Sequence, residues 1–161
     1  MNSCTALSIH LPATNNQKQE VMNGFLEKGE EQLFRGCISA INGYIQPIAK
    51  PRKKDCDGFP QAYWSGHYLL YGTNVQAICN SNCCFQYFVV VAPGKCPDQK
   101  AFERTQLSQI VSKLCPGQYI VGDAAYTSTD QGLCPFLEVK ENHLTKMHVT
   151  ISFRNYVLEL R

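Results

Sequence analysis

An apolar run that ends in a single carboxylate is the feature that most constrains what this chain can fold into. Tyr119 to Gly122 is short and apolar, Asp123 follows it directly, and Tyr126 comes soon after. A run of this length predicts a buried strand, and open α/β sheets bind their ligands at the carboxyl ends of strands. On this stretch alone, an Asp that caps the next turn is the simpler interpretation. The rest of the chain decides between the two.

Composition bounds the classes of protein to consider. A chain of 161 residues with 44% hydrophobic and 17% charged residues suits one folded domain. The net charge of +2 does not by itself indicate a nucleic-acid binder. The densest basic run contains Lys50, Arg52, Lys53 and Lys54. These cations could contact phosphates, but a solvated loop is the simpler interpretation.

The cysteines indicate an intracellular protein. There are nine, an odd number, and no secretory signal or membrane-spanning run is present in the sequence. We therefore expect reduced thiols and a nuclear or cytoplasmic location. Cys79, Cys83 and Cys84 cluster without partners at zinc-finger spacing, and we expect Cys84 to face the core.

The first half of the chain predicts a helix followed by strands. Pro12 to Gly24 is typical of a helix capped by Thr14 or Asn15. The pair Asn42-Gly43 then interrupts an apolar segment: a hairpin turn is the local interpretation, and a strand that continues through the pair is the alternative. The runs His67 to Cys79 and Phe85 to Ala92 predict an antiparallel hairpin.

The second half predicts a helix and then the strand that carries Asp123. An apolar stripe from Phe102 to Leu114 indicates an amphipathic helix of about four turns, with Asp98 as its N-cap. Residues 137–161 are mixed, with alternating apolar residues at Val149, Ile151 and Phe153. The order of strands, helix and strand is the order of ribonuclease H-like proteins, an α/β fold.

Four blocks, in order and at matching spacing, carry a resemblance to a known family. They are Gly36–Gly43, Gly72–Cys79, Ala92-Pro93-Gly94 with Asp98, and Gly122–Tyr126. Together they resemble the DDE superfamily endonuclease domain of Harbinger (PIF)-type transposases. The resemblance implies a ribonuclease H-like mixed sheet flanked by helices. It divides the chain into a helical lead-in, residues 1–32, and an endonuclease domain, residues 33–161, that we expect to be incomplete at its C-terminal end.

The resemblance also implies a site that binds divalent metal, Mg²⁺ or Mn²⁺, and cleaves DNA phosphodiesters. Two such ions would activate the attacking water and stabilise the leaving oxygen. The family's acids map onto Asp98 and Asp123 as catalytic and metal-binding residues, and the first acid maps onto Asn42, an amide that can ligate without bringing charge. The final Glu of the family has no counterpart here, since the spacing of Glu159 does not fit its motif.

These departures predict a degenerate site with weakly bound metal, and three functions stay open. The chain is a relic or fragment of a nuclease, a domesticated module that binds protein or DNA without catalysis, or an active nuclease completed by a partner chain. Only about thirty residues precede the first strand, so we expect DNA binding to need a separate DNA-binding partner protein.

Overall fold

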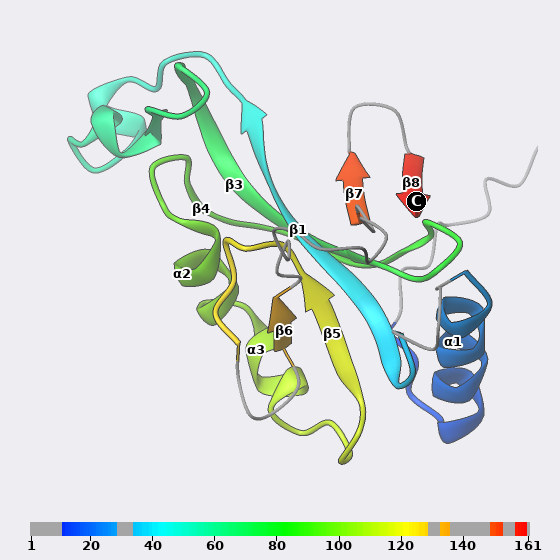
Figure 1. The fold of residues 1–161 in the computed structure, drawn as a ribbon. Helices are drawn as coiled ribbons and strands as arrows, with labels where there is room; N and C mark the ends of the chain where they lie inside the picture. The colour runs from blue at the N-terminus through cyan, green and yellow to red at the C-terminus, as the bar shows by residue number, and fades with distance from the viewer. Residues whose placement is uncertain (1–10, 29–33, 129–132, 136–148, 153–156, 161) are drawn as a thin grey trace, which may run out of the picture.

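The computed structural model describes residues 11–28, 34–128, 133–135, 149–152 and 157–160. One mixed sheet organises this part of the chain (Figure 1). Its strands are β1 (Cys37–Pro47), β2 (Trp64–Ser65), β3 (Leu70–Cys79), β4 (Phe85–Pro93), β5 (Tyr119–Gly122) and β6 (Leu133–Pro135).

Strand order and direction define the fold class. β3 lies between β4 and β1 and is antiparallel to both, whereas β5 is parallel to β1 and β6 is parallel to β5. The order β4-β3-β1-β5-β6 is a ribonuclease H-like α/β arrangement, as the sequence predicted. It brings the end of β5, where Asp123 follows, beside the middle of β1.

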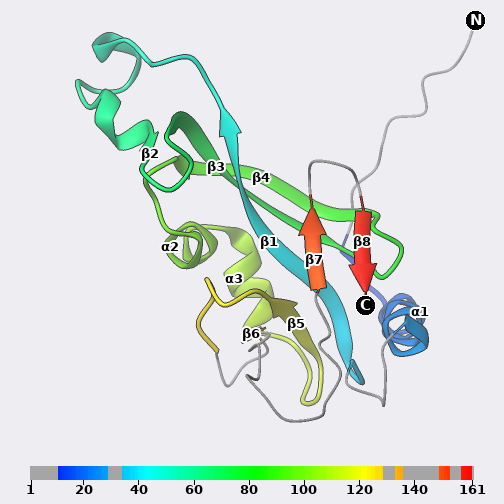
Figure 2. The same ribbon diagram turned by 45° about the horizontal axis from the view of Figure 1, so that its top comes forward.

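The helices cover the two faces of this sheet. They are α1 (Asn15–Lys28), α2 (Asp98–Glu103) and α3 (Gln106–Val111), with short 3₁₀ turns η1 (Lys53–Asp55) and η2 (Pro60–Tyr63). A separate hairpin pairs β7 (Val149–Ser152) with β8 (Val157–Leu160). In both Figure 1 and Figure 2, α2 and α3 lie together on one side of the sheet and α1 lies at its far end.

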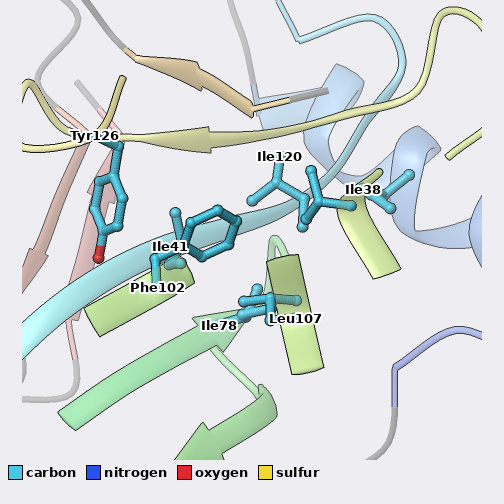
Figure 3. Close-up of a cluster of buried hydrophobic side chains, with 8 residues drawn as sticks. Ile38, Ile41, Ile78, Phe102, Leu107, Ile120 and Tyr126 are labelled. Atoms are coloured by element: carbon cyan, nitrogen blue, oxygen red, sulfur yellow. The ribbon is translucent and has the colours of Figure 1, made fainter. Parts of the chain in front are cut away.

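Two apolar clusters fix these layers. On the α2 and α3 side, Ile41, Ile78 and Ile120 pack against Phe102 and Leu107 (Figure 3). On the other side, Ala40, Cys79 and Val121 pack with Phe25 of α1. Neighbouring residues therefore belong to opposite clusters at Ala40 and Ile41, at Ile78 and Cys79, and at Ile120 and Val121, because side chains along a strand alternate between the two faces.

The turn predicted at Asn42-Gly43 is wrong, because β1 continues through both residues. Ala40 to Pro47 pairs without interruption with Cys79 to Gly72 of β3. A strand held by ladder hydrogen bonds along its whole length leaves no place for a hairpin. The β3–β4 hairpin, in contrast, is confirmed.

The long helix predicted after Asp98 is also wrong, because it is two short helices. Thr105 has an extended backbone (φ −87°, ψ 157°) and is the N-cap of α3, and its hydroxyl donates to the carbonyl of Phe102 at 2.7 Å. A Thr that bonds locally in this way competes with helix continuation. The N-cap of α2 is Pro97, and Asp98 is the first helical residue rather than the cap.

Two smaller predictions also need correction. Cys84 is exposed rather than buried, because it follows Cys83, whose positive φ of 63° turns the chain. The first helix continues past Gly24 to Lys28. Lys28 donates through Nζ to the Asn82 side chain at 2.9 Å, which ties the end of α1 to the β3–β4 turn.

The division into a lead-in and a domain stays a prediction, and Phe153 lies outside the described residues.

Candidate functional site

Asp98 stands at the start of α2 and leans onto the sheet. Its Oδ1 accepts from the side-chain amides of Asn74, at 2.7 Å, and Gln76, at 3.3 Å, both on β3. The carboxyl group lies directly over Gly43 of β1, where a Cβ atom would fall within 2.7 Å of Oδ2. Gly43 is therefore the residue of β1 that faces Asp98, and only a glycine leaves room for the carboxyl group.

The surroundings of Asp98 oppose its ionisation. Burial raises the pKa of its carboxyl group, and the nearby charge of Asp123 raises it further. The hydrogen bonds from Asn74 and Gln76 lower that pKa in part, because amide donors stabilise the carboxylate. Asp98 and Asp123 therefore interact electrostatically, although amide groups already occupy one oxygen of Asp98.

The same network continues to a buried tyrosine. Gln76 donates to Oδ1 of Asn74 at 2.8 Å and accepts at Oε1 from the Tyr126 hydroxyl, also at 2.8 Å. The Tyr126 ring meets the Phe102 ring edge-on, with centroids 6.1 Å apart, so the tyrosine packs into the apolar cluster that Figure 3 shows. Burial raises the pKa of Tyr126, and the charges of Asp98 and Asp123 raise it further.

Sequence reasoning missed Asn74 and Gln76. Both side chains are completely buried, and each finds a partner, as buried polar groups must. The signal was present in β3, where Asn74 and Gln76 alternate with Val75 and Ala77. Polar residues at a period of two on an otherwise apolar strand indicate a polar network on one face of the sheet.

Asp123 occupies a different environment. It follows β5 directly, is exposed, and accepts at Oδ1 from the backbone N–H of Ala125 at 3.0 Å. Its own carbonyl accepts from the Tyr126 N–H at 3.2 Å. The residue therefore caps a turn, as its sequence context suggested, and also stands at the carboxyl end of a central strand, where α/β proteins bind ligands.

Asn42 lies beside Asp123 rather than beside Asp98. The β1–β5 register pairs Ala40 with Val121, and two further residues along each strand bring Asn42 level with Asp123. Gly43 faces Asp98, so the alternation of side chains turns Asn42 to the opposite face of the sheet. Asp123 follows Gly122, whose Cβ position meets Tyr126 and Ile41. Asp123 itself lies just after the end of β5, level with Asn42, and its charge acts on Asp98.

The three predicted site residues therefore form two groups. Asn42 is level with Asp123 along the strands, and Asp98 lies within its amide network on the face of β1 opposite to Asn42. Within the described ranges, no group of three His, Cys, Asp or Glu side chains is placed to hold a metal ion. One carboxylate with one amide is an oxygen donor set that suits Mg²⁺ or Mn²⁺, but it does not fit a pair of ions.

Comparison with known proteins identifies the family. The model of the DDE superfamily endonuclease family matches residues 41–156, well over half of the chain, and this range includes Asn42, Asp98 and Asp123. The chain belongs to the DDE superfamily endonuclease family. No curated protein matches the chain, and no solved structure does.

Membership relates the chain to transposase-derived nucleases, enzymes that act on DNA and generally use divalent metals. The resemblance to a DDE endonuclease is thus confirmed, whereas the Harbinger subtype stays a prediction. In the part of the chain that the structure describes, no helix has the length and apolar character that crossing a bilayer requires.

Proposed function

We propose that this chain is a Harbinger-type, transposase-derived DDE endonuclease domain whose metal site is degenerate. Asn42 and Asp123 together bind one Mg²⁺ or Mn²⁺ ion weakly, and the chain alone does not cleave DNA efficiently. The observation that carries this proposal is the amide at position 42, level with Asp123 at the carboxyl end of β5.

Charge explains why the substitution matters. In this family a divalent ion supplies an activated water and stabilises the leaving oxygen, and two ions clamp the phosphodiester. An amide oxygen ligates without neutralising any charge, so a site with Asn42 and Asp123 offers a single negative charge to a dication. At an effective dielectric of about 20, each missing unit charge costs several kcal/mol of attraction. The exposure of Asp123 to water reduces that cost but also weakens the attraction that remains.

Asp98 does not replace the missing carboxylate. Its Oδ1 already accepts from Asn74 and Gln76, and its carboxyl group lies over Gly43, on the face of β1 opposite to Asn42. We propose that Asp98 acts on the ion through its charge and through the placement of α2, rather than as a ligand of the Asn42 and Asp123 site.

Calorimetric titration of Mn²⁺ into the folded chain tests the proposal. The wild type is expected to bind weakly, Asp123→Ala to lose binding, and Asn42→Asp to bind at least about tenfold more tightly, a gain of about 1.4 kcal/mol. Glu20→Gln is a matched control, because it changes one exposed carboxylate on α1. Failure of Asn42→Asp to tighten binding would refute the assignment of position 42.

A second function, a domesticated binding module, is favoured by one observation. Phe88 and Val90 on β4 are 52% and 57% exposed, and Phe88 pairs with Ala77, which pairs in turn with Asn42. Exposed apolar residues on one strand are typical of an interaction surface. If this is the function, the chain forms a complex with its partner in the absence of metal. The double variant Phe88→Ser, Val90→Ser should abolish this complex, whereas Asp123→Ala should retain it. If Asp123→Ala also abolished the complex, the result would favour the nuclease proposal instead.

A further inference from the structure

A projecting segment between β1 and β3 is not explained by the nuclease site. We call residues 48–69 the arm. Figure 1 and Figure 2 both show it extending from the end of β1, away from α1. Its return to the sheet is well anchored: β2 pairs with the start of β3, Trp64 meets the Tyr71 ring at 5.0 Å, and Lys95 donates through its backbone N–H to Ala62 at 3.0 Å.

The tip of the arm is a compact turn rather than an irregular loop. The carbonyl of Lys53 accepts from the N–H groups of Cys56 and Gly58, at 3.4 and 2.8 Å. The Phe59 N–H donates to the Cys56 carbonyl at 2.9 Å. The Cys56 side chain is buried and points back to the carbonyls of Arg52 and Lys53. These bonds therefore define the backbone conformation of the turn.

The arm carries the densest positive charge in the sequence. Lys50, Arg52, Lys53 and Lys54 are all exposed. Arg52 is paired with Asp55, with Nε and Oδ2 2.7 Å apart, which leaves the three lysines to meet an external anion. Lys50 also lies over the Tyr71 ring, 5.7 Å from its centroid, at the base of the arm.

Large apolar side chains project from the same segment into solvent. Phe59 is 72% exposed, Leu69 is 73% exposed and Tyr68 is 55% exposed. Phe59 follows Gly58, whose N–H bonds to Lys53, so an exposed aromatic residue and two exposed lysines belong to one turn. Exposed aromatic rings interleaved with cations are the pattern with which proteins bind single-stranded nucleic acid, through base stacking and phosphate contacts.

Backbone conformation singles out the same segment. Among the described residues, the non-glycine positions with positive φ are Asp57, Leu69 and Cys83, and the first two lie in the arm. Leu69 has φ 54°, which is uncommon for a bulky residue. Strained backbone of this kind clusters at binding sites, where the strain fixes a functional conformation.

The arm lies next to the candidate site along the chain. Asn42 and Pro47 are five residues apart on β1, a span of about 16 Å at the usual rise of a strand. The base of the arm therefore continues directly from the strand that carries Asn42.

We propose that the arm is a binding surface for single-stranded DNA, in which Lys50, Lys53 and Lys54 contact phosphates and Phe59 stacks on a base. That the nucleic acid is DNA rests on the proposed function; the binding chemistry rests on the arm alone. The surface supplies affinity that the near-neutral chain otherwise lacks, and it does so without metal.

Fluorescence anisotropy tests this surface, with a short labelled oligodeoxythymidylate and a duplex of equal length, both in EDTA. We expect the single strand to bind more tightly than the duplex, with a salt slope of about −2 for three phosphate contacts. Lys53→Gln with Lys54→Gln should weaken binding about tenfold or more and reduce that slope by about 1.4. Phe59→Ala should weaken binding about tenfold without changing the slope.

The matched control is Arg104→Gln with Lys113→Gln, which removes the same charge from exposed positions on the α2 and α3 layer. The proposal is overturned if the wild type binds no oligonucleotide, if this control weakens binding as much as the lysine pair, or if Phe59→Ala leaves the affinity unchanged. Binding to anionic lipid vesicles without binding to oligonucleotide would assign the arm to a membrane surface instead. Because EDTA removes free metal, none of these outcomes depends on the cation site, whose failure the Mn²⁺ titration reports separately.

Discussion

Replacing Gly43 with Ala tests the placement of Asp98 most sharply. A methyl group at this position would lie within 2.7 Å of Oδ2 of Asp98 and closer still to the other two carboxyl atoms. Central strand residues cannot move away cheaply, because Gly43 pairs with Gln76 in the middle of the β1–β3 ladder. The carboxyl group of Asp98 must therefore leave its position.

The cost follows from the hydrogen bonds that break. Asp98 would lose its bonds from Asn74 and Gln76. Bonds to a charged group contribute about 1.5–3 kcal/mol each, but both amides keep one partner. Asn74 still donates to the Cys96 carbonyl at 3.1 Å, and Gln76 still donates to Asn74 at 2.8 Å. We therefore expect a loss of about 2–3 kcal/mol in the free energy of unfolding.

Urea denaturation followed by circular dichroism measures this loss. For a typical urea slope, the midpoint should fall by about 1 M. Gly66→Ala is the matched control, since no atom lies within 4 Å of its Cβ position, and it should change stability by less than about 1 kcal/mol. A Gly43→Ala variant as stable as Gly66→Ala would refute the close contact between Asp98 and β1.

Three further predictions concern titration, the buried network and thiol reactivity. Burial raises the pKa of Asp98 from its ordinary value of 3.8, so the folded state holds the proton more tightly than the unfolded state, and the contribution of Asp98 to stability falls as pH rises through the raised pKa. Asp98→Asn should flatten the dependence of the urea midpoint on pH over the range from about pH 4 upward. Tyr126→Phe removes the 2.8 Å bond to Gln76 and should cost about 1–2 kcal/mol in the same assay. Burial raises the pKa of the Cys79 thiol to about 12, so an aromatic disulfide reagent near neutral pH should modify the exposed Cys84 and spare Cys79 until the chain unfolds.

Each of these has a clear contrary result. An unchanged pH profile in Asp98→Asn would mean that another group causes the profile. Tyr68→Phe is the control for the buried tyrosine, because Tyr68 is 55% exposed, and equal losses in the two variants would contradict the role of the Gln76 bond. Modification of Cys79 at the rate of Cys84, mapped by peptide mass spectrometry, would contradict the burial of this thiol.

The sequence predicted the fold from patterns that burial enforces. The apolar runs of β3, β4 and β5 and the stripe through Phe102 gave the α/β class, because a sheet and its helices must bury those residues together. The break at Thr105 was not predicted, because the apolar stripe continues across it and conceals the local cap. At Asn42-Gly43 the local interpretation as a turn was wrong for a related reason, and the alternative of a continuing strand was right. Asn-Gly favours a turn locally, and only pairing with a distant strand overrides that preference.

The sequence predicted which residues belong to the site, but not how their side chains are arranged. Family motifs indicated Asn42, Asp98 and Asp123, but the face to which each points depends on register and alternation. Gly43 supplies the decisive information, because it is the residue that Asp98 covers. The amide pair Asn74 and Gln76 could have been inferred from its period of two, whereas its bonds to Asp98 depend on where α2 begins.

The central claim is that Asn42 and Asp123, and not Asp98, ligate the ion, and Mn²⁺ binding in the Asn42→Asp background tests it directly. Electron paramagnetic resonance counts the free ion, and Asp123→Asn and Asp98→Asn each remove one carboxylate charge. We predict that Asp123→Asn abolishes binding and that Asp98→Asn changes the dissociation constant by less than about fivefold, about 1 kcal/mol. Equal loss of binding in the two variants would show that both acids ligate one ion and would contradict the account.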